Sequence, residues 1–157
     1  MSDSLNTDQP GISAGLLRRL SALLYDSFLI AAIWMLLGFL LQLVVGPDTS
    51  TLVDGRVETN PVLDVVLFAL MLGSCLGFYL WFWCQSGQTL GMLAWRIRLV
   101  DRAGGPVSWQ QALLRWLLAW PAFFALGLGY FWLYFNPDRI TLHDRWSQTR
   151  VILQPKP

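Results

Sequence analysis

Two long runs of apolar residues dominate the chain and predict two membrane-spanning helices. The first run, residues 27–45, has 19 residues and no charged side chain. As a helix it is about 28 Å long, close to the hydrocarbon thickness of a bilayer. The second run, residues 62–84, carries one charge, Asp64, and ends in an aromatic segment typical of a membrane–water boundary. We expect spans at about residues 20–45 and 62–84.

A third apolar run, residues 112–135, is compatible with two structures. Its 24 residues suffice for one span and not for two. Arg115 lies near its start, Pro121 in its interior, and two glycines follow. Proline and glycine here fit either a kinked span or a re-entrant segment packed against the other spans. The expected fold is an all-α membrane protein: a small helical bundle of two transmembrane helices and this third segment.

The polar segments predict turns and short extended pieces. Residues 46–60 are polar and rich in turn-forming residues, so we expect a loop there. Residues 95–100 alternate between polar and apolar side chains, as a strand does, and the breakers of residues 101–106 follow. Residues 107–109 fit a short return strand, and residues 149–154 fit another strand in the tail.

Length and composition describe one small membrane domain. Of the 157 residues, 55% are hydrophobic and 13% charged, against about 25% charged residues in average soluble domains. A soluble chain of this size lacks the interior volume to bury so many apolar side chains, so lipid must cover part of the surface. We expect residues 1–14 to be a disordered polar tail and residues 15–157 to form the membrane domain.

The remaining composition argues against several functional classes. The net charge of +1 gives no general attraction to nucleic acid. Both cysteines lie in the second apolar run, where they fit small buried hydrophobes, and the chain has a single histidine, His143. We therefore expect no disulfide framework, metal site or cofactor. The chain also shows no nucleophile–base pattern, so we expect no enzyme.

Basic residues predict the orientation in the membrane. Arg18 and Arg19 precede the first span and three arginines follow the second, whereas the intervening loop has one arginine among three acids. Basic residues collect on the cytoplasmic side, so the N-terminus and the connector after the second span should be cytoplasmic. The tail carries four more basic residues. They would also be cytoplasmic only if the third run were re-entrant, and the charge bias favours that arrangement.

Asp26 is the most informative single residue. An acid in a membrane helix costs about 2.5–3.5 kcal/mol at the helix centre and less near the surface, and such residues usually face protein or a water cavity. Arg19 lies on nearly the same helix face, about 10 Å away along the axis. Joining the two would take the long arginine side chain, a water or a third group. Alternatively, Arg18 and Arg19 reach the lipid headgroups and Asp26 only marks a polar helix start.

Ordered motifs along the chain carry a family resemblance. They are Arg19-Leu-Ser-Ala-Leu-Leu-Tyr-Asp26; Gly87-Gln-Thr-Leu-Gly91; Arg96-Ile-Arg-Leu-Val-Asp101; Gly104-Gly-Pro106 with Ala112-Leu-Leu-Arg115; and Leu142-His-Asp-Arg-Trp-Ser-Gln-Thr149. Each motif alone is weak. In this order, over nearly the whole chain, they resemble the RDD family of bacterial integral membrane proteins. The resemblance implies a bacterial membrane protein; together with the apolar runs and the charge bias, we expect a multi-pass protein of the plasma membrane, the bacterial inner membrane, with a cytoplasmic N-terminus.

The family is named for one arginine and two aspartates, which match Arg19, Asp26 and Asp144; Asp101 competes with Asp144 for the last position. If the three form one ionic network, Asp144 must lie on the N-terminal side of the membrane. If the strand of the tail pairs with the strand at residues 96–100, the tail must again share that side. Both conditions favour the re-entrant third run.

Three further positions qualify the resemblance. Where the family often has lysine after Thr-x-Gly, this chain has Met92. A phosphate or headgroup role of that lysine would not carry over to this chain unless Arg96 substitutes for it. Arg115 is better explained as snorkelling to the headgroups than as a ligand. Asp101, Arg96 and Arg115 are therefore secondary candidates beside the network of Arg19, Asp26 and Asp144.

Two function classes follow. The family has been suspected of transport, and a titratable carboxylate inside the membrane slightly favours a transport or ion-translocation role. Two or three spans are few for a pathway, so this role needs a homo-oligomer in the lipid bilayer. The alternative is a structural or interaction module without transport activity, whose loop and tail face an unknown protein partner.

Overall fold

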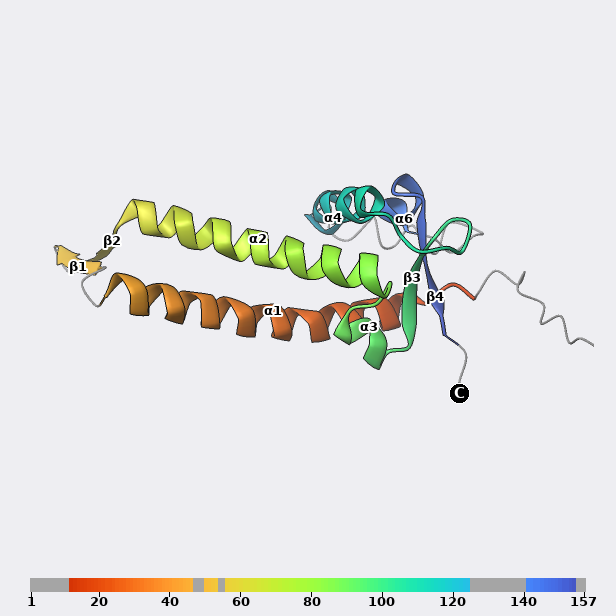
Figure 1. Ribbon diagram of the computed structural model, residues 1–157, viewed down its shortest axis with the longest axis horizontal. Coiled ribbons are helices and arrows are strands. Elements are labelled where there is room, and N and C mark those ends of the chain that lie inside the picture. Colours follow the sequence, from red (N-terminus) through yellow and green to blue (C-terminus); the bar gives the residue numbers. More distant parts are fainter. Residues whose placement is uncertain (1–11, 47–49, 54–55, 125–140, 155–157) are drawn as a thin grey trace, which may run out of the picture.

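The computed structural model of the protein describes residues 12–46, 50–53, 56–124 and 141–154. Two long helices, α1 (Leu16–Val45) and α2 (Pro61–Gln85), lie side by side along the length of the molecule (Figure 1). Both are long and apolar enough to cross a membrane, and very few of their residues are buried within the chain. A core helix of a soluble protein would be covered by protein, so lipid is the solvent that these two helices require.

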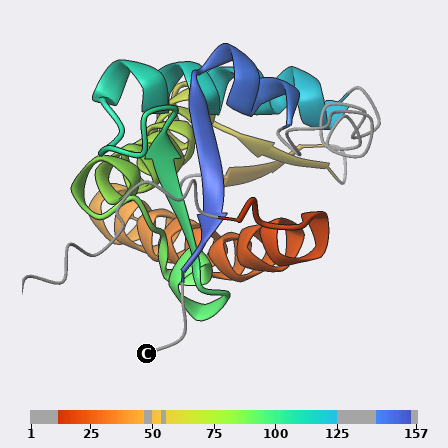
Figure 2. The ribbon, with the colours of Figure 1, turned by 90° about the vertical axis from the view of Figure 1, so that its right-hand side faces the viewer.

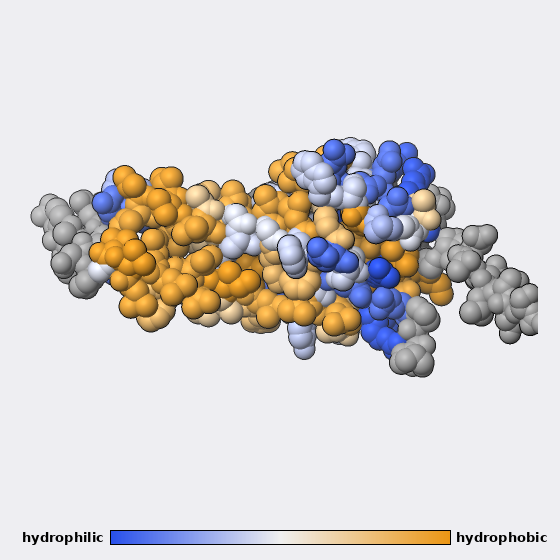
Figure 3. All heavy atoms as spheres, in the orientation of Figure 1, coloured by the Kyte–Doolittle hydropathy of each residue, from blue (hydrophilic) through white to orange (hydrophobic). Residues whose placement is uncertain are grey.

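The surface divides into an apolar shaft and a polar end. Figure 3 shows apolar side chains over the length of α1 and α2, and hydrophilic ones gathered where α1 begins and α2 ends. We call this end the base. It contains α3 (Leu90–Ala94), β3 (Ile97–Asp101), α6 (Leu142–Trp146) and β4 (Thr149–Leu153). The expected class, a small helical membrane protein with short extended segments, is confirmed.

Local sequence explains where the long helices start and stop. α1 begins at Leu16, before the apolar run, so Arg19 and Asp26 are helical residues. It ends at Val45, and the next residue, Gly46, has a φ of 92° that few other residues tolerate. α2 begins with Pro61 at its first position, and the Asn60 side chain accepts a hydrogen bond from the Val62 backbone N–H at 3.0 Å. Proline and an asparagine cap are favourable at a helix start.

The base is built around two antiparallel strands that are far apart in sequence. β3 pairs with β4 with Leu99 opposite Val151, and both of these side chains are buried. The strand in each expected segment is thus confirmed. The chain before α1 extends the same sheet: the Ala14 N–H donates to the Val151 carbonyl and the Leu153 N–H to the Ile12 carbonyl, each at 2.9 Å. The start of α1 is thereby tied to the tail. Residues 1–11 of the expected disordered tail lie outside the described residues.

Three polar segments differ from the sequence interpretation. The expected loop after α1 contains a hairpin, β1 (Ser50–Val53) with β2 (Arg56–Thr59), and the sequence between them, Asp-Gly, is favoured in two-residue turns. The polar connector after α2 contains a short helix that the residue pattern did not predict, α3, which the Thr89 side chain caps by accepting from the Met92 N–H at 3.2 Å.

The expected return strand at residues 107–109 is wrong, because Trp109 begins a helix, α4 (Trp109–Phe124). Ser108 and Gln111 make the reciprocal hydrogen bonds of a capping box: the Ser108 N–H and hydroxyl donate to Gln111 Oε1, and the Gln111 N–H donates to Ser108 Oγ at 3.3 Å. This start signal outweighs the strand pattern, since it satisfies backbone donors that a helix leaves open.

The third apolar run begins at the base, and the described chain resumes there with α6 and β4. α4 is foreshortened in Figure 1 and seen lengthwise in Figure 2, so its axis runs across the α1–α2 pair. It packs against α2 and α6. Because β4 pairs with β3, the tail lies at the same end as the start of α1. A single crossing would have placed the tail at the opposite end; the re-entrant alternative agrees with this position. Residues 125–135 of the run lie outside the described residues.

Helix α3 is held directly against α1 at a glycine. A Cβ on Gly91 would overlap the Ala22 carbonyl oxygen and lie 2.8 Å from a carboxylate oxygen of Asp26. Real side chains do not approach this closely, so either α3 or α1 would have to move. Gly91 therefore sets the distance between the base and the membrane helix.

We predict that Gly91→Ala lowers the free energy of unfolding by about 1–3 kcal/mol, because the added methyl overpacks this contact. Thermal unfolding of the purified protein in neutral detergent measures the effect. Gly77→Ala is the matched control, since a Cβ there meets nothing within 4 Å. Equal melting temperatures for the two variants would contradict the packing argument.

Candidate functional site

A buried carboxylate lies between two arginines at the base. Asp144 of α6 forms ion pairs with Arg19 of α1 through Oδ2 and with Arg115 of α4 through Oδ1. Asp144 is fully buried and each arginine is 7% exposed. Charges so deeply buried require partners, because each loses the water that would otherwise stabilise it. The three residues form what we call the arginine–aspartate cluster.

Local structure positions the carboxylate. Thr141 precedes α6, and its backbone N–H donates to Asp144 Oδ2 at 3.2 Å, so the carboxylate also caps its own helix. Burial alone would raise the pKa of Asp144, but the charges of Arg115 and Arg19 outweigh it and hold this pKa well below its ordinary range. Asp144 is therefore anionic at physiological pH.

Each arginine also joins the cluster to another part of the base. Arg19 Nε donates to the Ala14 carbonyl at 2.9 Å, next to the sheet edge. Arg115 Nη1 donates to Thr149 Oγ1 of β4 at 3.0 Å, and its guanidinium lies 5.4 Å from the ring centroid of Trp83 in α2. The cluster thus connects α1, α2, α4, α6 and β4.

His143 adds no charge to the cluster. Its ring is 3% exposed, and Nε2 lies 3.1 Å from Thr141 Oγ1 and 3.8 Å from Asp144 Oδ1. Burial, with the nearby charge of Arg115, lowers the pKa of His143 from 6.5 to about 3, although Asp144 acts in the opposite direction. The imidazole is neutral at physiological pH. Two cations therefore face one anion, and the cluster carries a net positive charge.

Asp26 forms a separate site on α1. It is 2% exposed and accepts hydrogen bonds from Thr89 Oγ1 at 2.5 Å and from the Gly91 backbone N–H at 2.9 Å. Among the described residues, no ion pair joins it to Arg19. The structure thus brings Arg19 and Asp144 together and leaves Asp26 at the joint between α1 and α3.

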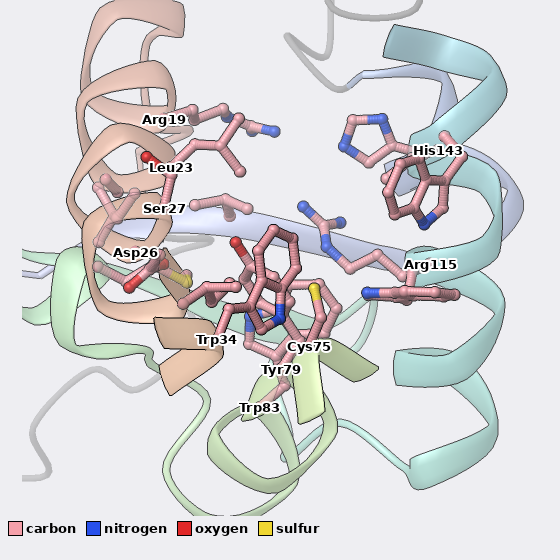
Figure 4. Close-up of a pocket in the computed structure, with 18 residues that line it drawn as sticks. Arg19, Leu23, Asp26, Ser27, Trp34, Cys75, Tyr79, Trp83, Arg115 and His143 are labelled. Carbon is pink, nitrogen blue, oxygen red and sulfur yellow. The ribbon is translucent and has the colours of Figure 1, made fainter. Parts of the chain in front are cut away.

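Both sites border one cavity of about 320 Å³. Figure 4 shows Arg19 and Asp26 on one side of it and Arg115 and His143 on the other. The rest of the wall is mostly apolar and rich in aromatic side chains from α1, α2 and α4, namely Trp34, Tyr79, Trp83, Trp116 and Trp120. A space of this size, with a few polar groups on an apolar wall, has the character of a small-molecule site.

The secondary candidates Arg115, Asp101 and Arg96 occupy different positions in the structure. Arg115 does not snorkel: it is buried and paired with Asp144, so that interpretation is wrong. Asp101 is half-buried and accepts a hydrogen bond from the Ala103 N–H in a turn, and no ion pair joins it to the cluster among the described residues. Arg96 has a φ of 55° at the turn before β3. Met92 lies in the cavity wall, where the resemblance would place lysine.

Several residues of the site had no clear signal in the sequence. Thr89 is visible only as a helix cap once α3 is known, and nothing in the sequence places Trp83 beside Arg115. The described residues contain no group of three His, Cys, Asp or Glu side chains that could hold a metal. Cys75 and Cys84 are both free thiols.

Comparison with known proteins gives one result. A family model, described as the RDD family, matches residues 13–148, which include both aspartates and both arginines of the site. No curated protein and no solved structure matches the chain.

Asp144→Asn should destabilise the protein by about 3–5 kcal/mol, because the neutral amide leaves two buried guanidinium groups without a counter-charge. Chemical or thermal unfolding in neutral detergent measures the loss. Asp101→Asn removes an acid from a half-buried turn and should change stability far less. The cluster would lose its assigned role if the two variants were equally stable.

Acid should destabilise the protein through the buried imidazole of His143. The pKa of His143 is about 3 in the folded chain and 6.5 in the unfolded one, so the unfolded state binds the proton first. This contribution to stability is complete above pH 6.5 and is lost progressively as the pH falls toward 3. Since His143 is the only histidine, His143→Gln should reduce the change in melting temperature between pH 7 and pH 5. An unchanged slope in that variant would refute the assignment.

Proposed function

The chain belongs to the RDD family and is a membrane protein, and we propose that it acts in transport, as the ion- or solute-binding unit of a homo-oligomer. Asp26 carries the proposal. It is a buried carboxylate on an apolar helix, in the wall of a cavity, and its contacts are hydrogen bonds from Thr89 and Gly91. Carboxylates in such positions are typical of proton and cation pathways.

The arginine–aspartate cluster supports the proposal in a second way. Arg19 and Arg115 border the same cavity as Asp26, so their charge acts on any ion that approaches the carboxylate. The cluster also closes the base around the cavity, because it joins α1 to α4 and α6. Asp26 would bind the transported ion, and the arginines would adjust its affinity.

A homo-oligomer is needed because the long apolar stretches of α1 and α2 carry no charged residue that could pass an ion along. No charged residue occurs between Asp26 and the end of α1, or between Asp64 and the end of α2. Ions do not cross an apolar helix pair without polar groups. A continuous pathway would therefore form between copies.

We further propose that both helices span the bacterial inner membrane, with the base in the cytoplasm. Exposed arginines gather at the base, on α1, β3, the turn after it and α6: Arg18, Arg98, Arg102 and Arg145. The excess of positive charge on cytoplasmic segments supports this orientation.

The alternative is a structural or interaction module that transports nothing. The observation that favours it is the number of elements that the cluster joins. A network of this kind can have a purely structural role, which is to hold the elements of the base together. The polar base would then face a protein partner. In that case Asp26→Asn would mainly lower the amount of folded protein, and a partner would co-purify with the wild type.

Ion flux in reconstituted vesicles distinguishes the two proposals. We expect the wild type to couple an imposed sodium or potassium gradient to proton movement, read by an entrapped pH dye. Asp26→Asn should reduce this flux at least about tenfold, because the carboxylate that exchanges the ion is lost. Asp64→Asn is the matched control, since Asp64 is an exposed acid in the first turn of α2.

Equal reconstitution of the variants, checked by size-exclusion chromatography, keeps a folding defect apart from a transport defect. Wild-type flux no greater than that of protein-free vesicles would reject the transport proposal. Full flux in Asp26→Asn would reject the role of the carboxylate.

A further inference from the structure

The cavity presents positive charge to any occupant. Asp144 is absent from the wall, whereas Arg19 and Arg115, which hold it, both border the space. Figure 4 shows the two arginines reaching into it from opposite elements, α1 and α4. With His143 neutral, this end of the cavity is electropositive and complements an anion.

Donors without acceptors lie on the same wall. Arg115 uses only Nη1 in its hydrogen bonds to Asp144 and Thr149; Nε and Nη2 have no acceptor among the described residues. The indole N–H of Trp83, a residue 8% exposed, also has no partner within the described part of the chain. Buried donors in proteins are nearly always satisfied. An acceptor-rich group placed between Arg115 and Trp83 would satisfy these donors.

The cavity is ordered from polar to apolar along the membrane helix. Its wall on α1 runs from Arg19 at the base to Trp34, which is about 22 Å of helix. That length exceeds half of the hydrocarbon thickness of a bilayer, about 15 Å. A lipid of one leaflet has the same order, with a charged head at the surface and a chain toward the centre.

The cavity is also accessible from the side. Leu23 and Ser27 of α1 and Trp120 of α4 line it and are exposed on the outer surface as well. Within the described part of the chain, the cavity is therefore open to the surface where these residues of α1 and α4 line it. On a helix that requires lipid as its solvent, such an opening faces the bilayer.

The remaining charge in the wall does not compete for the anion. The Asp26 carboxylate is engaged by Thr89 and Gly91 on the α3 side of α1, whereas the guanidinium groups meet on the α6 side. A negatively charged head can therefore approach Arg115 without displacing Asp26.

We infer that the cavity binds one anionic phospholipid of the surrounding leaflet, with its phosphate at Arg115, Arg19 and the Trp83 N–H and one acyl chain along the aromatic wall. The site recognises net negative charge together with a chain. A zwitterionic lipid brings a cation toward the positive cluster and binds less well. The inference concerns the same cavity as the proposed transport but does not depend on ion flux.

Lipid titration followed by native mass spectrometry tests this inference. The full chain in neutral detergent is titrated with phosphatidylglycerol and with phosphatidylcholine of identical chains. We expect a single tightly held phosphatidylglycerol per chain and an affinity for phosphatidylcholine at least about tenfold weaker. Equal affinity for the two lipids would overturn the assignment of the arginines to the head.

A pair of variants on α4 tests the position of the chain. Ala119→Phe fills the cavity away from the cluster, so it should weaken phosphatidylglycerol binding at least about tenfold. Leu117→Phe is the matched control, because Leu117 is exposed and does not line the cavity. Undiminished binding by Ala119→Phe would overturn the inference.

Inorganic phosphate separates a lipid site from a simple anion site. Phosphatidylglycerol should remain bound in millimolar phosphate, because the chain contributes to its affinity. Displacement by millimolar phosphate would show a site that recognises the anionic group alone, without the chain, and would overturn the proposal. Phosphatidylglycerol binding retained in Asp26→Asn, with flux lost, would support both proposals. Binding without any wild-type flux would reject transport alone.

Discussion

The base of this protein depends on the carboxylate of Asp144, which is the counter-charge of two buried arginines. Arg19 and Arg115 come from helices far apart in the chain, and each would be a buried charge without Asp144. Because an unpaired buried ion costs several kcal/mol, the start of α1, helix α4 and the tail must fold together or not at all. The hydrogen bonds from Ala14 to Val151 and from Arg115 to Thr149 belong to the same assembly.

A second constraint acts where the base meets the membrane helix. Asp26 is satisfied only because Gly91 lets the backbone of α3 come close enough to donate to it. The base therefore holds an acid inside the apolar helix and encloses a cavity beside it. The two sites share a cavity and use different chemistry: one carboxylate is held by neutral donors, the other by cations. The charges of Arg19 and Arg115 keep Asp144 ionised, whereas no cation pairs with Asp26 among the described residues.

Much of the architecture follows from the sequence because lipid imposes simple rules. Uninterrupted apolar runs of about 20 residues must be helical in a bilayer, since every backbone group needs a partner. Alternation at residues 95–100 and 149–154 likewise marked the two strands of the base. The hairpin after α1 and helices α3 and α6 are too short for periodicity to reveal. The return strand expected at residues 107–109 was wrong because Ser108 and Gln111 form a helix cap there.

The sequence by itself determined that this is a membrane protein with two long apolar helices, and ordered motifs were enough to identify Arg19, Asp26 and Asp144 as residues to examine. Only the tertiary structure decided how they are partnered. Arg115 was expected to reach the headgroups, yet it forms an ion pair with Asp144, as Arg19 does. Asp26 accepts a hydrogen bond from Thr89 and, within the described part of the chain, is not paired with Arg19. The physical reason is that hydrophobicity is a local property of the chain, whereas the partner of a buried charge depends on which distant segments the fold brings within hydrogen-bonding distance.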